Sequence, residues 1–312
     1  MFSLTRLRLP IAFIVALALA ALLALAAFSQ TASATHAWGT YHWATKQYPF
    51  TLQLGDNVSS AWDGYLNTTS LGTQNKGWDY STKLDTNIVA GGTIGRQCRP
   101  TSGRVEVCNA NYGSTGWLGI AQIWASGSRI VQGTTKLNDT YFNTAKYNTP
   151  AWRNLVMCQE VGHTFGLAHQ DENFTNTNLG SCMDYTNNPS GGGTNGALSN
   201  EYPNSHDYAQ LGTIYNATDT TNTVGNTSAA SRFPGEANRG DLNSRRDWGR
   251  LIRNSPDMRL QKYERDFGNN IKMFTFVIWA ENAPQANGNG REDEHTEDEH
   301  TEGESAPAES AE

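Results

Sequence analysis

One stretch constrains the fold of this chain more than any other: VMCQEVGHTFGLAHQDE, residues 156–172. Thr149 and Pro150 precede it, an N-cap residue followed by proline at the first helical position, so we expect a helix to begin there. Because a helix turns about 100° per residue, Gln159 and His163 lie about 40° apart on one face. The stretch therefore predicts a helix with two polar side chains stacked one turn apart.

Three further residues of this stretch complete a cluster. Glu160 lies about 60° from His163 around the same helix, close enough to face the same ligand. Gly166 can end the helix in a left-handed turn, so that the chain doubles back and His169 meets His163. A catalytic zinc needs three protein ligands, an open fourth position for water and a carboxylate beside that water, and this geometry can supply them.

These residues resemble the signature of the metzincin zinc peptidases, H-E-x-x-H-x-x-G-x-x-H followed by a methionine turn. QEVGHTFGLAH matches every defining position except the first, where Gln159 replaces histidine. SCMDY, residues 181–185, resembles the methionine turn, with Met183 under the metal. Tyr185 lies where astacin-like and serralysin-like members carry a tyrosine able to reach zinc. The resemblance covers roughly residues 36–216.

The resemblance implies an endopeptidase acting on peptides or proteins with one catalytic zinc ion. His163 and His169 would bind the zinc, joined by Gln159 directly or through water. Glu160 would act as general base, and Tyr185 would stabilise the oxyanion.

Two further expectations concern Gln159 as a zinc ligand and the carboxylate beside His169. The amide oxygen of glutamine is a poorer zinc ligand than imidazole, so we expect weaker zinc binding. Asp171 either orients His169 from behind or is an ordinary exposed carboxylate.

Two other functions compete with the peptidase. A catalytically inactive metzincin-fold protein would bind peptides without cutting them. An adhesion or carbohydrate-binding module would use exposed aromatic residues, for which the candidates are Trp38, Trp43, Trp62 and Trp78.

The four cysteines predict two disulfides, with three possible connectivities. Local pairing, Cys98 with Cys108 and Cys158 with Cys182, is the interpretation we favour. The second bond would lock the motif helix to the methionine turn.

Composition divides the chain into five parts. Residues 1–34 have charged, apolar and small-residue regions in the order of a cleaved signal peptide, which predicts a secreted protein; a retained membrane anchor is the alternative. The others are a catalytic domain (35–217), a linker (218–231), a small hairpin-containing segment (232–283) and a disordered acidic tail (284–312).

The formal charge of −7 comes from the two ends of the chain. Acidic residues crowd the last part, 291–312, and Arg6 and Arg8 lie in the signal segment, so the body between is near neutral. This balance argues against nucleic-acid or membrane partners, and we expect a monomer.

Periodicity predicts an α+β fold, and the resemblance specifies a twisted, mostly parallel sheet with an active-site helix and a C-terminal helix. The remaining expectations are a strand at 49–56, a helix after it capped by Ser59 or Ser60, a hairpin at 96–108 and a buried or edge strand at 117–125. The resemblance implies that residues 119–125 of this strand align an extended substrate by strand addition. We also expect a helix at 204–215 capped by Ser205 and a small hairpin appendage turning at 268–270.

Overall fold

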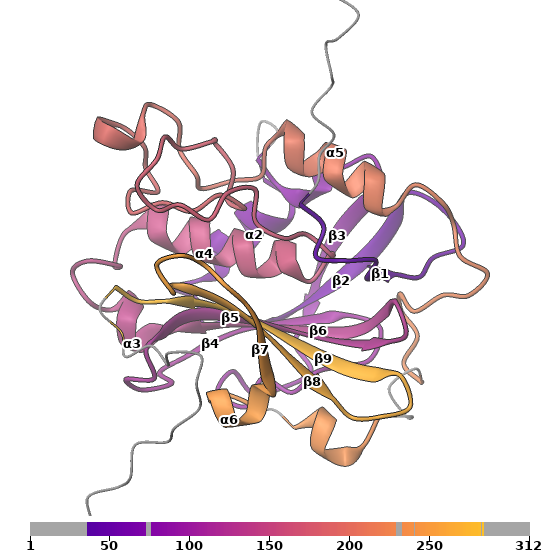
Figure 1. Ribbon diagram of the computed structural model, residues 1–312. Helices are drawn as coiled ribbons and strands as arrows, with labels where there is room; N and C mark the ends of the chain where they lie inside the picture. Colours follow the sequence, from indigo (N-terminus) through magenta and orange to yellow (C-terminus); the bar gives the residue numbers. More distant parts are fainter. Residues whose placement is uncertain (1–35, 73–75, 229–232, 240, 282, 284–312) are drawn as a thin grey trace, which may run out of the picture.

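The protein is an α+β domain built on one open, mixed sheet of nine strands (Figure 1). The computed structural model describes residues 36–72, 76–228, 233–239, 241–281 and 283. The predicted signal peptide (1–34) and acidic tail (284–312) lie outside these ranges. The strands are β1 His42–Trp43, β2 Phe50–Asn57, β3 Leu84–Ala90, β4 Val105–Ala110, β5 Trp117–Ser126, β6 Arg129–Asn138, β7 Arg250–Asn254, β8 Leu260–Asp266 and β9 Ile271–Trp279.

The sheet has a parallel half and an antiparallel half. The strand order is β3-β2-β4-β6-β5-β9-β8-β7. Strand β1 lies outside this series and pairs with β6. Neighbours from β3 to β6 run parallel, whereas β5, β9, β8 and β7 are each antiparallel to their neighbours. The expected mostly parallel sheet therefore describes only one half of the observed sheet.

Helices α2, α4 and α5 lie on one face of the sheet, and α6 lies on the other (Figure 1). Thr149 caps α4 as predicted, since its side chain accepts a hydrogen bond from Trp152 N. The caps of the other two helices differ from expectation: α2 has no side-chain cap, and Asn204, rather than Ser205, caps α5. The helices are α2 Asp63–Ser70, α3 Asp139–Phe142, α4 Pro150–His163, α5 Ser205–Ile214 and α6 Arg245–Trp248, with 3₁₀ turns at Trp78–Tyr80, Gly193–Asn195 and Gly235–Asn238.

The predicted hairpin at 96–108 is wrong, although its disulfide is correct. Cys98 and Cys108 are bonded, with Cα atoms 5.9 Å apart. Only the second half of the segment is a strand, β4, and it pairs with β2 and β6 rather than with its own neighbour. Cys98 lies in a turn with a positive φ of 44°. Strand pairing between distant segments has replaced the local pairing that the sequence pattern indicated.

The C-terminal hairpin turns at 268–270 as predicted, but it is not an appendage. Strands β7, β8 and β9, here called the C-terminal meander (250–279), extend the main sheet. β9 pairs antiparallel with β5 from Trp117 to Ser126. The edge of β5 that was expected to receive substrate is therefore occupied by the chain itself.

The four tryptophans considered as a binding surface are all buried. Three of them donate indole N–H groups to carbonyls of the motif helix and the residue after it: Trp38 to His163, Trp43 to Thr164 and Trp78 to Cys158. Tryptophan here fixes the end of α4, and these four side chains cannot form an exposed aromatic platform.

The chain after α5 is held against the domain. Asp219 N and Thr223 N donate to the carbonyls of Thr45 and Ala44. The predicted linker at 218–231 thus makes backbone contacts over its described part. No helix in the described ranges has the length and apolar character needed to span a membrane.

Candidate metal centre

Helix α4 places the polar cluster against the sheet. Gln159, Glu160 and His163 are all buried, and α4 packs on β5 and β6. Gly119 of β5 permits this close approach: a Cβ there would lie 2.6 Å from Val156 Cγ1 and 3.1 Å from a carboxylate oxygen of Glu160. The absence of a side chain at this position therefore sets how closely the glutamate lies to β5.

The chain turns back at Gly166, as the sequence predicted. Gly166 has a φ of +98°, and a Cβ there would lie 2.6 Å from the carbonyl oxygen of Tyr41. Leu167 then accepts a hydrogen bond of 2.8 Å from His163 Nδ1. The return brings His169 Nε2 to 2.8 Å from His163 Nε2. The two imidazoles thus converge through the nitrogens that a metal would use.

Polar contacts at the other ring nitrogens orient both imidazoles. His163 Nδ1 donates to the Leu167 carbonyl, and His169 Nδ1 lies 3.7 Å from the carboxylate of Glu172. His163, which donates from Nδ1, presents its Nε2 lone pair toward His169, as metal-binding histidines do toward a metal. The Tyr185 hydroxyl is bonded to His169 Nε2 as well.

Burial keeps both imidazoles neutral. It lowers the pKa of His163 well below its usual range, and the neighbouring His169 lowers it further. Burial also lowers the pKa of His169, although the hydrogen bond to Glu172 opposes this. A neutral imidazole is the form that binds a metal, so both groups are in the competent state near neutral pH.

Glu160 is a buried carboxylate beside this pair. Its exposed fraction is 1%. Burial raises its pKa well above the usual range, opposed by a hydrogen bond from the backbone of Ala121. Among the described residues, its Oε2 has no hydrogen-bond partner. The raised pKa favours the protonated carboxyl, so Glu160 would act as a base only where a nearby cation restores the carboxylate.

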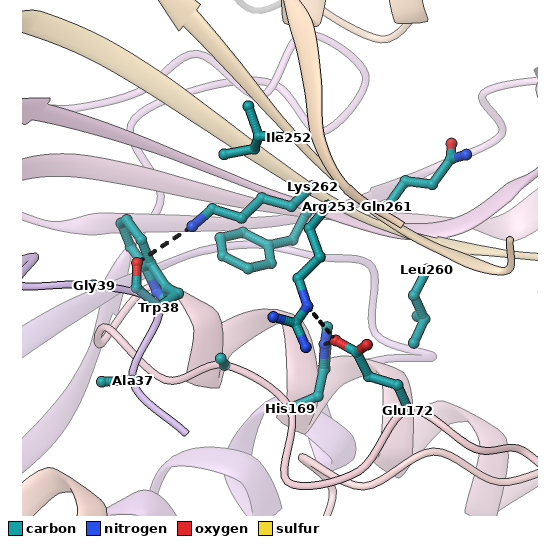
Figure 2. A pocket seen from close by; sticks show the side chains of 12 residues that line it. Ala37, Trp38, Gly39, His169, Glu172, Ile252, Arg253, Leu260, Gln261 and Lys262 are labelled. Atoms are coloured by element: carbon teal, nitrogen blue, oxygen red, sulfur yellow. Dashed lines mark hydrogen bonds and ion pairs between the residues drawn. The ribbon is translucent and has the colours of Figure 1, made fainter. Parts of the chain in front are cut away.

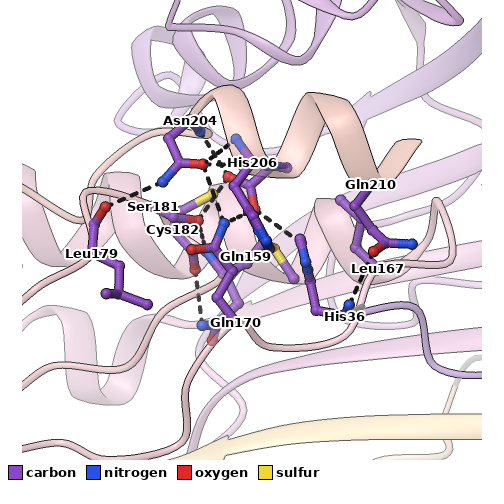
Figure 3. A network of polar contacts seen from close by, with 12 residues as sticks. His36, Gln159, Leu167, Gln170, Leu179, Ser181, Cys182, Asn204, His206 and Gln210 are labelled. Carbon is purple, nitrogen blue, oxygen red and sulfur yellow. Dashed lines mark hydrogen bonds and ion pairs between the residues drawn. The ribbon is translucent and has the colours of Figure 1, made fainter. Parts of the chain in front are cut away.

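Gln159 is tied to the 181–185 turn. Its Nε2 donates to Cys182 O at 2.9 Å, within the polar network of Figure 3. Ser181 of the same turn donates to Asp207, whose other oxygen lies 3.1 Å from His36 Nε2. Within the described part of the chain, Gln159 Oε1 is buried without a partner. The amide nitrogen is therefore used for structure, and the oxygen remains free for a ligand.

The residues present fit a metal ion incompletely. Two neutral imidazoles and an unpartnered amide oxygen are acceptable zinc donors. Their Nε2 atoms are closer, at 2.8 Å, than the roughly 3.3 Å between two ligands of a tetrahedral zinc. In the described ranges, no group of three or more His, Cys, Asp or Glu side chains is placed to hold a metal.

The 181–185 turn lies directly beneath α4. Cys158 of the helix is bonded to Cys182 of the turn, with Cα atoms 5.9 Å apart, as predicted. A Cβ on Gly162 would lie 2.6 Å from Met183 Sδ and 2.7 Å from the Trp78 ring. Met183 therefore supports the helix one residue before the first histidine.

Asp171 does not orient His169. Its carboxylate accepts hydrogen bonds from Asn173 N and Asn176 Nδ2 within its own loop. The carboxylate beside His169 Nδ1 belongs to Glu172. The sequence offered one signal for this, since a glutamate three residues after a ligand histidine is within reach of its ring.

The C-terminal meander covers the two imidazoles. Phe276 of β9 stacks on His163, with ring centroids 4.1 Å apart and planes inclined by 14°. A cavity of about 320 Å³ remains between the meander and the loop that carries His169 (Figure 2). Arg253 and Lys262 line it, and nothing in the sequence motif indicated any of these three meander residues.

Comparison with known proteins does not identify the chain. No protein-family model and no curated protein matches its sequence.

Proposed function

We propose that this protein is an exported zinc-dependent endopeptidase of metzincin type. The observation that carries the proposal is the pair of imidazoles whose Nε2 atoms converge at 2.8 Å beside Glu160. The contact is a hydrogen bond when one of the two Nε2 atoms carries a proton, and a metal ion held by both imidazoles would take the place of that proton. The two disulfides agree with export to an oxidising compartment.

His163 and His169 would hold the zinc, with the Oε1 of Gln159 as third donor directly or through water. The ion supplies a Lewis acid that polarises a peptide carbonyl and makes a water molecule more acidic. Glu160 would take a proton from a water molecule at the site through its unpartnered oxygen and would pass it to the leaving amine. The hydroxyl of Tyr185 is bonded to His169 Nε2 and would donate to a developing oxyanion.

A second function, peptide binding without cleavage, is favoured by the set of metal donors. Across the residues that the structure describes, no group of three or more His, Cys, Asp or Glu side chains is placed to hold a metal. Without the ion, a cleft of this kind would bind peptides and leave them uncut.

Two substitutions separate these functions. Glu160→Gln should leave the zinc content unchanged and reduce cleavage by about a hundredfold or more, the usual contribution of a general base. Gln159→His should tighten zinc binding under either function. Zinc is measured by elemental analysis of protein purified without chelator, and cleavage is measured on a peptide library.

Asp63→Asn serves as the control, since it makes the same acid-to-amide change at an exposed site on α2. Failure of the natural protein and of Gln159→His to take up zinc would refute the proposal. Zinc binding without zinc-dependent cleavage would favour the peptide-binding protein.

A further inference from the structure

Strand β9 occupies the site at which an extended substrate would add to the sheet. It pairs antiparallel with β5, and Ala121 lies opposite Phe276. Ala121 is also the residue whose backbone bonds Glu160. Strand addition would use the same backbone groups of β5, so β9 and a substrate cannot both pair there.

The side chains of β9 alternate between the two faces of the sheet. Phe274, Phe276 and Ile278 face the core that contains α4. Val277 and Trp279 face the opposite side, where they pack with Trp248 of α6. Phe276 thus closes the site, whereas Val277 stabilises the same strand without touching it.

Two polar contacts tie β7 and β8 to the walls of the cavity (Figure 2). Arg253 Nε donates to Glu172 at 2.6 Å, and Glu172 is the carboxylate beside His169. Lys262 Nζ donates to Trp38 O at 3.3 Å and lies 4.5 Å from the centre of the Trp38 ring. The meander is therefore anchored through the same side chain that orients a candidate metal ligand.

We propose that the C-terminal meander is a built-in blocker of the candidate active site, and that substrate binds only when β9 leaves β5. This inference rests on the proposed peptidase function. The segment that blocks the site then lies on its C-terminal side in the sequence.

The test compares a locked and a loosened protein. Gln122 and Thr275 lie directly opposite each other on β5 and β9, with Gln122 Nε2 3.4 Å from Thr275 Oγ1. Opposed antiparallel residues suit a disulfide, so Gln122→Cys/Thr275→Cys should lock the pair; each single cysteine variant is its control. Val277→Ala loosens β9 from the far face. Val105→Ala makes the same deletion in buried β4, which does not pair with β9.

Binding and cleavage of fluorescein-labelled casein are measured, together with zinc content. Val277→Ala should raise casein binding and casein cleavage by about tenfold, equivalent to about 1.4 kcal/mol in the opening equilibrium. Val105→Ala should leave casein binding and cleavage unchanged. The locked protein should fall at least about tenfold below the single-cysteine variants, with equal zinc in all.

The results separate the two proposals. Equal casein binding by locked and single-cysteine proteins, or an equal rise in Val105→Ala and Val277→Ala, overturns the blocker. The blocker proposal is also overturned if no variant binds casein. Binding that follows the expected order, with zinc present but no cleavage in any variant, supports the blocker and refutes the peptidase.

Discussion

The contact between Gly162 and Met183 gives a quantitative test of how the 181–185 turn supports α4. Alanine normally stabilises a helix interior by about 1 kcal/mol relative to glycine. At Gly162 the added Cβ would lie 2.6 Å from Met183 Sδ and 2.7 Å from Trp78. Overpacking of this kind costs about 1–3 kcal/mol. Gly162→Ala should therefore change stability by between about zero and a loss of 2 kcal/mol.

Gly212 of α5 provides the matched control, because a Cβ there would meet nothing within 4 Å. Gly212→Ala should show the full helical gain of about 1 kcal/mol. The difference between the two variants isolates the overpacking cost of about 1–3 kcal/mol. Urea unfolding followed by tryptophan fluorescence measures both. If Gly162→Ala stabilises as much as Gly212→Ala, the packing of Met183 beneath the helix is refuted.

Two further predictions concern groups away from the imidazoles. Burial lowers the pKa of Lys136 to about 7. Between pH 7 and the ordinary lysine pKa of the unfolded chain, the unfolded state binds more protons than the folded state. The free energy of unfolding therefore rises with pH over this range, by at most about 1.4 kcal/mol per pH unit. Urea unfolding at pH 7 and pH 9 should show this rise in the natural protein and a smaller one in Lys136→Met; equal slopes would contradict it. Replacing Cys158 and Cys182 by serine should cost about 3 kcal/mol for a loop of this length and weaken zinc binding. The same change at Cys98 and Cys108 should cost slightly less and leave zinc binding unaltered, and parallel loss of zinc in both would refute the special role of the first bond.

Residue patterns within short segments predicted the helix ends and turns that depend on neighbouring residues. Thr149 and Pro150 correctly predicted where α4 begins. Gly166 correctly predicted that the chain turns back after α4, because the nearby carbonyl of Tyr41 leaves no room for a side chain there. The turn at 268–270 was also read correctly from its glycine and two asparagines. The roles assigned to the imidazoles remain proposals.

Pairing between distant strands could not be predicted. The 96–108 segment alternates like a hairpin, yet the backbone groups of β4 are satisfied by β2 and β6. Strand β5 looked like a substrate edge because its partner lies more than a hundred residues later in the chain. An apolar run such as 271–279 predicts that the segment is buried, but it does not predict the strand with which the segment pairs.

The late position of β9 has a consequence for biosynthesis. Trp117–Ser126 is synthesised long before Ile271–Trp279, the strand that completes its pairing. During that interval the nascent chain presents a long apolar edge with unpaired backbone groups, a template for wrong association. The sheet is closed on this side only when the last strand arrives, and contacts so far apart in sequence form slowly. If the chain is exported before it folds, this edge crosses the membrane unpaired, and the final folding step takes place in the compartment where the disulfides form.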